Sequence, residues 1–293
     1  MPTSAAFNRV FDFAKGRHVS GDSLTGFLEK DISIAGRICR VYGDSEDHYF
    51  TGLPQKCSDH ESLFAILKRN GVSPQVIIDV GANLGLFTLG AHAVFPAADI
   101  FCYEPHPRAF AALALNTKPI SDKVVVNNCA LGDAEKSMLF YPGGPMNSNR
   151  SSGSHLMNES HWKEDHSGII VPVSTLDAQV RSRSIPRVDF IKIDVEGFEW
   201  DVLQGSLAVI ENFSPLIYLE FNSWALIALK NINPRMFLDY LGDYFAHVYR
   251  CNHDATVTKL ETGEDRIEFL HENLITHGCV DDLLVSNVDV VVQ

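Results

Sequence analysis

The sequence predicts an α/β fold built on a mostly parallel sheet with helices on both faces, and three observations point to it. Short apolar runs alternate with helix-like segments from residue 75 onward, which is the pattern of successive βαβ units. The runs are apolar almost throughout, as expected for strands that are covered on both faces. Four of them end in an acidic residue, at the edge where ligands bind in such sheets: Asp79, Glu104, Asp194 and Glu220.

Length and composition are those of an ordinary globular protein. The chain has 293 residues, of which 45% are hydrophobic and 21% charged, and its formal net charge is −13. Such a charge repels phosphate backbones and anionic lipid headgroups, so nucleic-acid and membrane partners are disfavoured. The six cysteines form no CxxC pair, and no window approaches the length of apolar sequence that spans a membrane. This cysteine usage suits the reducing cytoplasm.

The predicted elements follow one another in a regular order. The expected strands and helices, in chain order, are 75–81, 87–94, 98–105, 108–118, 123–133, 188–197, 198–212 and 215–222. Residues 141–168 are rich in Gly, Ser, Asn and His and predict a long loop, a feature that is usually functional or mobile in a compact domain. After residue 222, a helix and two strand candidates at 245–251 and 281–287 would complete the sheet.

The first motif, DVGANLG, stands where the first strand meets its helix. Gly81 permits a tight turn, Gly85 allows close approach to a ligand, and the helix N-terminus offers free N–H groups. Glu104 ends the next strand, where a carboxylate can accept hydrogen bonds from both hydroxyls of a ribose. A dinucleotide site requires G-x-G-x-x-G, but here Asn83 replaces the second glycine. Asp79 could instead face the cationic amino-acid part of S-adenosylmethionine (SAM).

Two later motifs add charged groups near the same edge of the sheet. In NCALGD, Asp133 follows a strand end and would lie near the adenine edge of a bound nucleoside. In IKIDVEG, Lys192 and Asp194 share one side of a buried strand, and Glu196 follows in the turn. Burying several charges together is costly unless they pair or meet a ligand. We therefore expect the second cluster to serve the function.

Five segments together resemble the FkbM family of SAM-dependent methyltransferases: DVGANLGLFT, YEPHP, NCALGD, VSTLDA and IKIDVEGFEWDVLQG. The resemblance covers residues 76–222. It implies a Rossmann-like class I methyltransferase fold with a seven-stranded, mostly parallel sheet whose last strand is antiparallel. Residues 1–58 lie outside it, and we expect this N-terminal extension to serve acceptor binding or oligomerisation. The methyltransferase domain would then comprise residues 59–293.

The resemblance also implies an activity, the transfer of a methyl group from SAM to a hydroxyl oxygen of a sugar, a glycan or a secondary metabolite. It marks Asp79, Gly81, Asn83, Gly85 and Glu104 as cofactor contacts. The expected partner is a small-molecule or glycan acceptor, with no nucleic acid and no membrane, and the expected location is the cytoplasm.

A hydroxyl group is a poor nucleophile until it loses its proton, so the site needs a general base. Histidine has a suitable pKa without adjustment, whereas a carboxylate needs its pKa raised by burial or by a neighbouring carboxylate. The candidates are Asp194, Glu196, Glu220 and one histidine of the long loop, which is His155, His161 or His166.

Two alternative functions stay open at this point. A non-catalytic SAM-binding protein would keep the glycine motif and Glu104 but lack a working base. An NAD-dependent oxidoreductase would need a glycine spacing that this chain does not have. Three acids at one edge could also hold Mg²⁺ or Ca²⁺, because hard cations prefer oxygen ligands, but we expect no bound metal.

Overall fold

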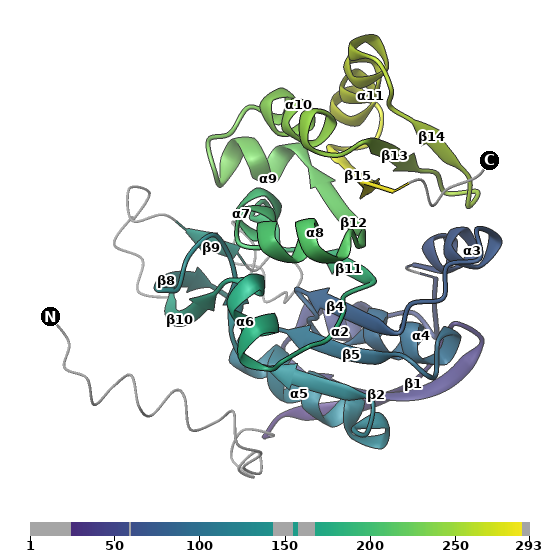
Figure 1. Cartoon of the computed structure of the whole chain (residues 1–293). Helices are drawn as coiled ribbons and strands as arrows, with labels where there is room; N and C mark the ends of the chain where they lie inside the picture. The colour runs from purple at the N-terminus through teal and green to yellow at the C-terminus, as the bar shows by residue number, and fades with distance from the viewer. Residues whose placement is uncertain (1–24, 59, 143–154, 158–167, 289–293) are drawn as a thin grey trace, which may run out of the picture.

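The computed structural model describes residues 25–58, 60–142, 155–157 and 168–288. Its centre is an eight-stranded sheet with helices on both faces, which confirms the predicted α/β class (Figure 1). From one edge to the other the strands are β6 (Val124–Asn127), β5 (Asp99–Tyr103), β4 (Val76–Val80), β11 (Phe190–Ile193), β12 (Leu216–Asn222), β15 (Val280–Ser286), β13 (His247–Cys251) and β14 (Val257–Lys259).

The directions of the strands agree with the expected class I pattern. The five strands from β6 to β12 are parallel to one another. β15, the last strand of the described residues, lies between β12 and β13 and is antiparallel to both. The expected count of seven strands is wrong by one, because β14 pairs with β13 as an additional edge strand. Its three residues are exposed or half-buried, so no apolar run marks it in the sequence.

Both faces of the sheet are buried under helices, because consecutive strand residues point to opposite faces. Ile78 and Ile191 belong to a core shared with α6, α7, α8, α10 and α11, whereas Ile77 and Phe190 belong to a core shared with α3, α4 and α5. The helices are α3 (Glu61–Arg69), α4 (Leu86–Val94), α5 (Pro107–Thr117) with a 3₁₀ turn at Lys118–Ile120, α6 (Leu176–Ser182), α7 (Glu199–Gln204), α8 (Leu207–Phe213), α9 (Ser223–Ala228), α10 (Pro234–Tyr244) and α11 (Gly263–Ile275).

A small second sheet replaces part of the long loop predicted at 141–168. Its strands, in spatial order, are β7 (Ala130–Leu131), β10 (Ile169–Ser174), β8 (Lys136–Tyr141) and β9 (His155–Met157). The loop prediction is wrong for residues 155–157, because β9 pairs with β8 and buries Leu156. Residues 143–154 and 158–167 lie outside the described residues.

The N-terminal segment forms a three-stranded sheet that shares a core with the main domain. Its elements are β1 (Phe27–Ile34), β2 (Arg37–Asp44), α2 (His48–Gly52) and β3 (Lys56–Cys57), with strand order β2-β1-β3. Ile34 and Phe50 pack in one apolar cluster with Leu86 of α4 and Ala112 of α5. The side chain of Asn116 on α5 accepts from the backbone N–H of Tyr42 (2.7 Å) and donates to the Tyr42 carbonyl (3.0 Å).

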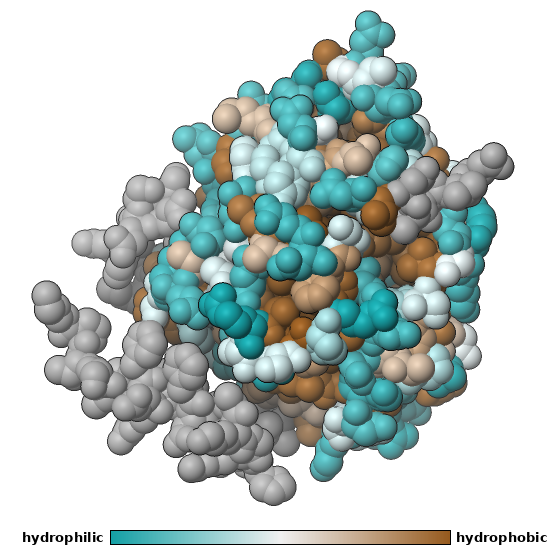
Figure 2. Space-filling view, viewed as in Figure 1, coloured by the Kyte–Doolittle hydropathy of each residue, from teal (hydrophilic) through white to brown (hydrophobic). Residues whose placement is uncertain are grey.

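The visible surface of the described residues is mainly hydrophilic. Figure 2 shows hydrophilic side chains over most of the visible face, with apolar areas between them. Within the described ranges, no helix combines the length and the apolar character that a membrane span requires. The six cysteines all lie in those ranges, and each is a free thiol.

The Asn116 contact gives a direct test of the shared core. We expect Asn116→Leu to lower the free energy of unfolding by about 2–3 kcal/mol, because Asn116 is buried and the partly buried N–H of Tyr42 would lose its acceptor. The exposed neighbour Lys118 serves as the control, and Lys118→Gln should change stability by less than about 0.5 kcal/mol. Urea denaturation measures both, and wild-type stability of Asn116→Leu would contradict this account.

Candidate active site

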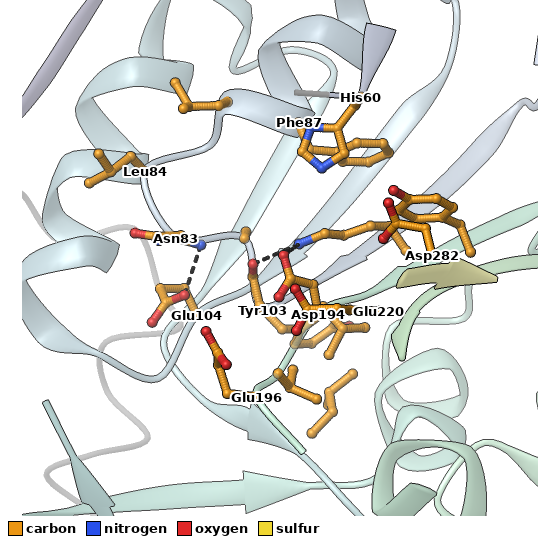
Figure 3. A pocket seen from close by; sticks show the side chains of 18 of the residues that line it. His60, Asn83, Leu84, Phe87, Tyr103, Glu104, Asp194, Glu196, Glu220 and Asp282 are labelled. Atoms are coloured by element: carbon orange, nitrogen blue, oxygen red, sulfur yellow. Dashed lines mark hydrogen bonds and ion pairs between the residues drawn. The ribbon is translucent and has the colours of Figure 1, made fainter. Parts of the chain in front are cut away.

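A cavity of about 510 Å³ lies beyond the carboxyl ends of the central strands (Figure 3). Its wall comes from the loop after β4, the ends of β5, β11 and β12, the start of β15 and part of the small sheet. The predicted site residues that line it are Gly81, Asn83, Glu104, His155, Asp194, Glu196 and Glu220. Segments from distant parts of the sequence are therefore brought together at the edge predicted for the ligand.

The loop after β4 depends on glycine at two positions. Gly81 has φ +75°, and a Cβ atom there would lie 1.9 Å from the carbonyl oxygen of Asp194. Gly85 has φ +87°, begins α4 as its N-cap and faces Leu113 of α5, so it shapes the loop from behind the cavity. Asn83 has φ +49°, a conformation that asparagine tolerates better than most residues. The loop is thereby held close against β11.

Glu104 is a buried carboxylate at the end of β5 that holds this loop in place. Its Oε2 accepts from the backbone N–H of Asn83 (2.8 Å; Figure 3). Its Oε1 accepts from the backbone N–H of His106 (2.7 Å). Burial raises the pKa of Glu104 to about 7, although both backbone hydrogen bonds oppose the rise. Each carboxylate oxygen can still accept a second hydrogen bond, so the group remains able to bind a diol.

Asp79 does not line the cavity but lies beneath the loop, fully buried. Its Oδ2 accepts from the Thr88 hydroxyl (2.6 Å), and its Oδ1 lies 3.6 Å from the Lys192 Nζ. Burial raises the pKa of Asp79 above its usual value, and the nearby ammonium opposes this rise. The structure therefore gives Asp79 a supporting position, whereas the sequence analysis expected a direct cofactor contact.

Lys192 joins three parts of the site through one ammonium group. It is 3% exposed, donates to the Gly81 carbonyl (2.9 Å) and lies 3.2 Å from Oδ2 of Asp194. Burial lowers the pKa of Lys192, but Asp194 and Asp79 more than offset this effect, so the pKa is raised and the ammonium stays charged. Lys192 was not among the predicted site residues, although the IKIDVEG motif placed it on the same side of the strand as Asp194.

Two carboxyl groups share a single amide donor at the end of the cavity formed by β11 and β12. The Nδ2 of Asn222 lies 3.4 Å from Oε2 of Glu196 and 3.3 Å from Oε2 of Glu220. Glu196 occupies a left-handed turn with φ +52° just after β11. Burial, followed by repulsion from Asp194, raises the pKa of Glu196 to about 8 and that of Glu220 well above its usual value.

Asp282 is a fourth acid in this part of the cavity, and it was not among the site residues predicted from the sequence. It lies directly opposite Glu220 across the antiparallel pair of β12 and β15. Burial raises the pKa of Asp282 to about 6, although a hydrogen bond with Tyr218 opposes the rise. The antiparallel direction of the last strand was the available signal, because it places the start of that strand at the same edge as the ends of its parallel neighbours.

The histidine candidates differ in what the structure shows of them. His155 on β9 is buried, lines the cavity and stacks on Tyr141 with ring centroids 5.9 Å apart. His161 and His166 lie outside the described residues. His60 also lines the cavity and contacts the Phe87 ring edge-on at a centroid distance of 5.3 Å. Its position just before α3 gave no signal in the sequence.

Asp133 lies at a different surface cleft from the rest of the predicted site. That cleft has a volume of about 420 Å³ and is also lined by Trp200 and Lys230. The Asp133 carboxylate accepts from the Lys136 ammonium (2.7 Å). Its expected contact with an adenine edge finds no support in this position, whereas Ala130 and Leu131 of the same motif do line the large cavity.

Metal ligation by the acids was left open as an alternative in the sequence analysis, where no bound metal was expected. In the part of the chain that the structure describes, no group of three or more His, Cys, Asp or Glu side chains is arranged to hold a metal ion.

The strand order, the glycine loop and the acid at the end of β5 define a Rossmann-like class I methyltransferase. Residues 79–274 match the family model described as the methyltransferase FkbM domain. The chain therefore belongs to the FkbM methyltransferase family, as its sequence motifs indicated. This membership leaves the NAD-dependent alternative without support.

Two curated relatives are 2-O-methyltransferase NoeI of Sinorhizobium fredii and 31-O-demethyl-FK506 methyltransferase FkbM of Streptomyces tacrolimicus. The first is 27% identical over 176 residues, covering 57% of this chain and 70% of the relative. The second is 30% identical over 156 residues, covering 44% of this chain and 58% of the relative. Among solved structures, one that aligns is the T. thermophilus 16S rRNA N2 G1207 methyltransferase in complex with AdoMet and guanosine. The alignment has a TM-score of 0.45 and 11% sequence identity. It covers 90% of this chain and 51% of that chain.

The buried Lys192–Asp79 pair can be tested by a double-mutant cycle. We expect Lys192→Met to lower the free energy of unfolding by about 3–5 kcal/mol, because it leaves Asp79 buried without a counter-charge. Adding Asp79→Asn should restore part of the loss. Lys123→Met, which breaks an exposed pair with Asp99, is the control and should cost under about 1 kcal/mol. Strictly additive losses in the double variant would show that the two charges do not interact.

Proposed function

We propose that this protein transfers the methyl group of SAM to a hydroxyl oxygen of a small molecule or a glycan. The observation that carries the proposal is the meeting, in one cavity, of the glycine loop and Glu104 with a cluster of carboxyl groups. The names of NoeI and FkbM describe methyl transfer to oxygen, which supports the choice of a hydroxyl acceptor. The acceptor itself is proposed only as a chemical class.

The residues on the loop side of the cavity fit an adenosyl cofactor. Glu104 presents carboxylate oxygens at a strand end, where they can accept hydrogen bonds from the two ribose hydroxyls. The Oδ1 atom of Asn83 is buried at the cavity and has no hydrogen-bond partner among the described residues. A buried polar atom without a partner is costly, and a ligand donor would satisfy it. Ala130 and Leu131 add apolar surface against which the adenine ring of the cofactor can pack.

When bound, SAM supplies a methyl group that is activated by its sulfonium charge. The task of the chain is then to orient the acceptor hydroxyl and to take its proton. We take Glu196 as the base, because it lines the cavity and because burial, followed by repulsion from Asp194, raises its pKa to about 8. A raised pKa makes a carboxylate a stronger proton acceptor. Its carboxylate oxygen would receive the proton while Asn222 holds the group in position. His155 is the alternative base.

The cofactor half of the proposal is tested with Glu104. We expect Glu104→Ala to weaken SAM binding by about 1.5–3 kcal/mol, or roughly tenfold to 150-fold, which is the size of a lost charge-assisted hydrogen bond. Glu135→Ala removes an exposed carboxylate outside the cavity and should leave the Kd unchanged. Calorimetry measures both, and equal Kd values for Glu104→Ala and wild type would remove Glu104 from the cofactor site.

The catalytic half is tested with isosteric amides on an acceptor panel of sugars, glycans and secondary metabolites. We expect Glu196→Gln to lower turnover by about 10²-fold or more, the scale of a lost general base, while SAM affinity changes by less than about tenfold. Glu211→Gln on the surface of α8 is the matched control.

The wild-type rate should also rise as pH increases through about 8, because Glu196 accepts a proton only after losing its own. Wild-type turnover in Glu196→Gln, Asp194→Asn and Glu220→Gln would move the base to His155. Binding of SAM with no methyl transfer to any acceptor would favour the non-catalytic alternative.

A further inference from the structure

The charges that line the cavity are unbalanced. Among its described lining residues, the acids are Glu104, Asp194, Glu196, Glu220 and Asp282, whereas Lys192 is the only lysine or arginine. The Lys192 ammonium already pairs with Asp194 and with Asp79 beneath the loop. No lysine or arginine in the described part of the chain pairs with Glu196, Glu220 or Asp282, which we call the carboxyl trio.

The trio is arranged in a way that works against the fold. Glu220 and Asp282 occupy directly opposite positions in an antiparallel pair, where like charges destabilise a sheet. Glu196 is brought to the same place by the Asn222 amide, which lies within 3.4 Å of both glutamates. Burial disfavours the charged form of all three groups and raises their pKa values. A cationic ligand in the cavity would relieve this repulsion.

The proposed cofactor provides such a cation, and its product does not. SAM carries a sulfonium, an ammonium and a carboxylate, so its net charge is positive. S-adenosylhomocysteine (SAH) lacks the sulfonium charge and is neutral overall. A single methylene carbon joins the sulfur to the ribose, so a ribose held by Glu104 keeps the sulfur in the same cavity as the trio.

We propose that Glu196, Glu220 and Asp282 recognise the positive charge at the sulfur of the methyl donor, so that the cavity binds SAM more tightly than SAH. This inference rests on the proposed function. The charge disappears when the methyl group leaves, and the attraction between product and cavity weakens at that moment. The trio thus gives the site a means to retain substrate and release product.

The proposal has a defined dependence on pH. Because the pKa is about 8 for Glu196 and about 6 for Asp282, more of the trio is ionised at about pH 8.5 than at about pH 6, and the preference for SAM should grow as pH rises. Other charged or titratable groups of the described residues also face the trio. They are Lys192 on β11, Asp194 just after it, Glu199 on α7, Tyr218 on β12, Asp281 on β15, Asp79 on β4, Glu104 after β5, and His60, His155 and His253 at the cavity wall.

The test is calorimetric binding of three ligands, and it requires no acceptor. The ligands are SAM, SAH and sinefungin, an analogue that carries an ammonium group in place of the sulfonium methyl. At about pH 8.5 we expect SAM and sinefungin to bind roughly tenfold more tightly than SAH, equivalent to about 1.4 kcal/mol, with a smaller ratio at about pH 6. The Glu196→Gln/Glu220→Gln double variant and Asp282→Asn should both reduce this ratio.

Matched controls keep the outcomes distinct. Glu135→Gln removes one negative charge outside the cavity and should retain the wild-type ratio. Thermal unfolding checks the variants, and Asp282→Asn should be at least as stable as wild type because it removes the repulsion with Glu220. Asp282→Asn alone carries the test if the double variant does not fold.

Two results would overturn the inference. One is binding of SAH as tight as that of SAM by the wild-type protein, and the other is an unchanged ratio in the trio variants. Failure of all three ligands to bind would instead overturn the proposed function, because it would remove the adenosyl cofactor from the cavity.

Discussion

The buried ammonium of Lys192 is the contact on which the candidate site depends. It donates to the Gly81 carbonyl and pairs with Asp194 and Asp79, so it ties the glycine loop of β4 to the end of β11. The close approach of these two strands leaves no room for a Cβ atom at Gly81. Because the Lys192 ammonium pairs within this framework, Glu196, Glu220 and Asp282 have no lysine or arginine partner among the described residues. The pairing of Lys192 with Gly81, Asp79 and Asp194 therefore both stabilises the loop and leaves the cavity negatively charged.

Much of this arrangement follows from local sequence patterns. The alternation of apolar runs and helices predicted the parallel sheet, and the acids at strand ends predicted which edge would hold the cavity. Glu104 could be placed because it directly follows the apolar run that becomes β5, and Glu196 because it lies in the turn after the run that becomes β11. These predictions succeed because the side-chain periodicity of a strand and the geometry of a parallel sheet are both set within short stretches of chain.

The parts that sequence patterns did not reveal depend on pairing between distant segments. Asp282 enters the site only through the register of β15 against β12, and β9 forms only because β8 offers it a free edge. Asp133 was assigned to the cofactor from its motif, but the turn after β7 directs it to another cleft. Asp79 was expected at the ligand, but the pairing of β4 with β11 sets it opposite Lys192 and leaves it buried beneath the loop.

The N-terminal sheet, which lies outside the methyltransferase motifs, also helps to position the glycine loop. Asn116 joins the backbone of β2 to the carbonyl of Leu84 in the glycine loop, so the position of the loop relies on both segments. The central claim is that this loop and the carboxyl cluster enclose one adenosyl cofactor. A crystal structure of the protein with SAH tests it most directly. The account predicts Glu104 oxygens about 2.6–3.2 Å from both ribose hydroxyls, with the sulfur facing Glu196. An adenosyl group bound in the Asp133 cleft, or in the cavity without contact to Glu104, would contradict it.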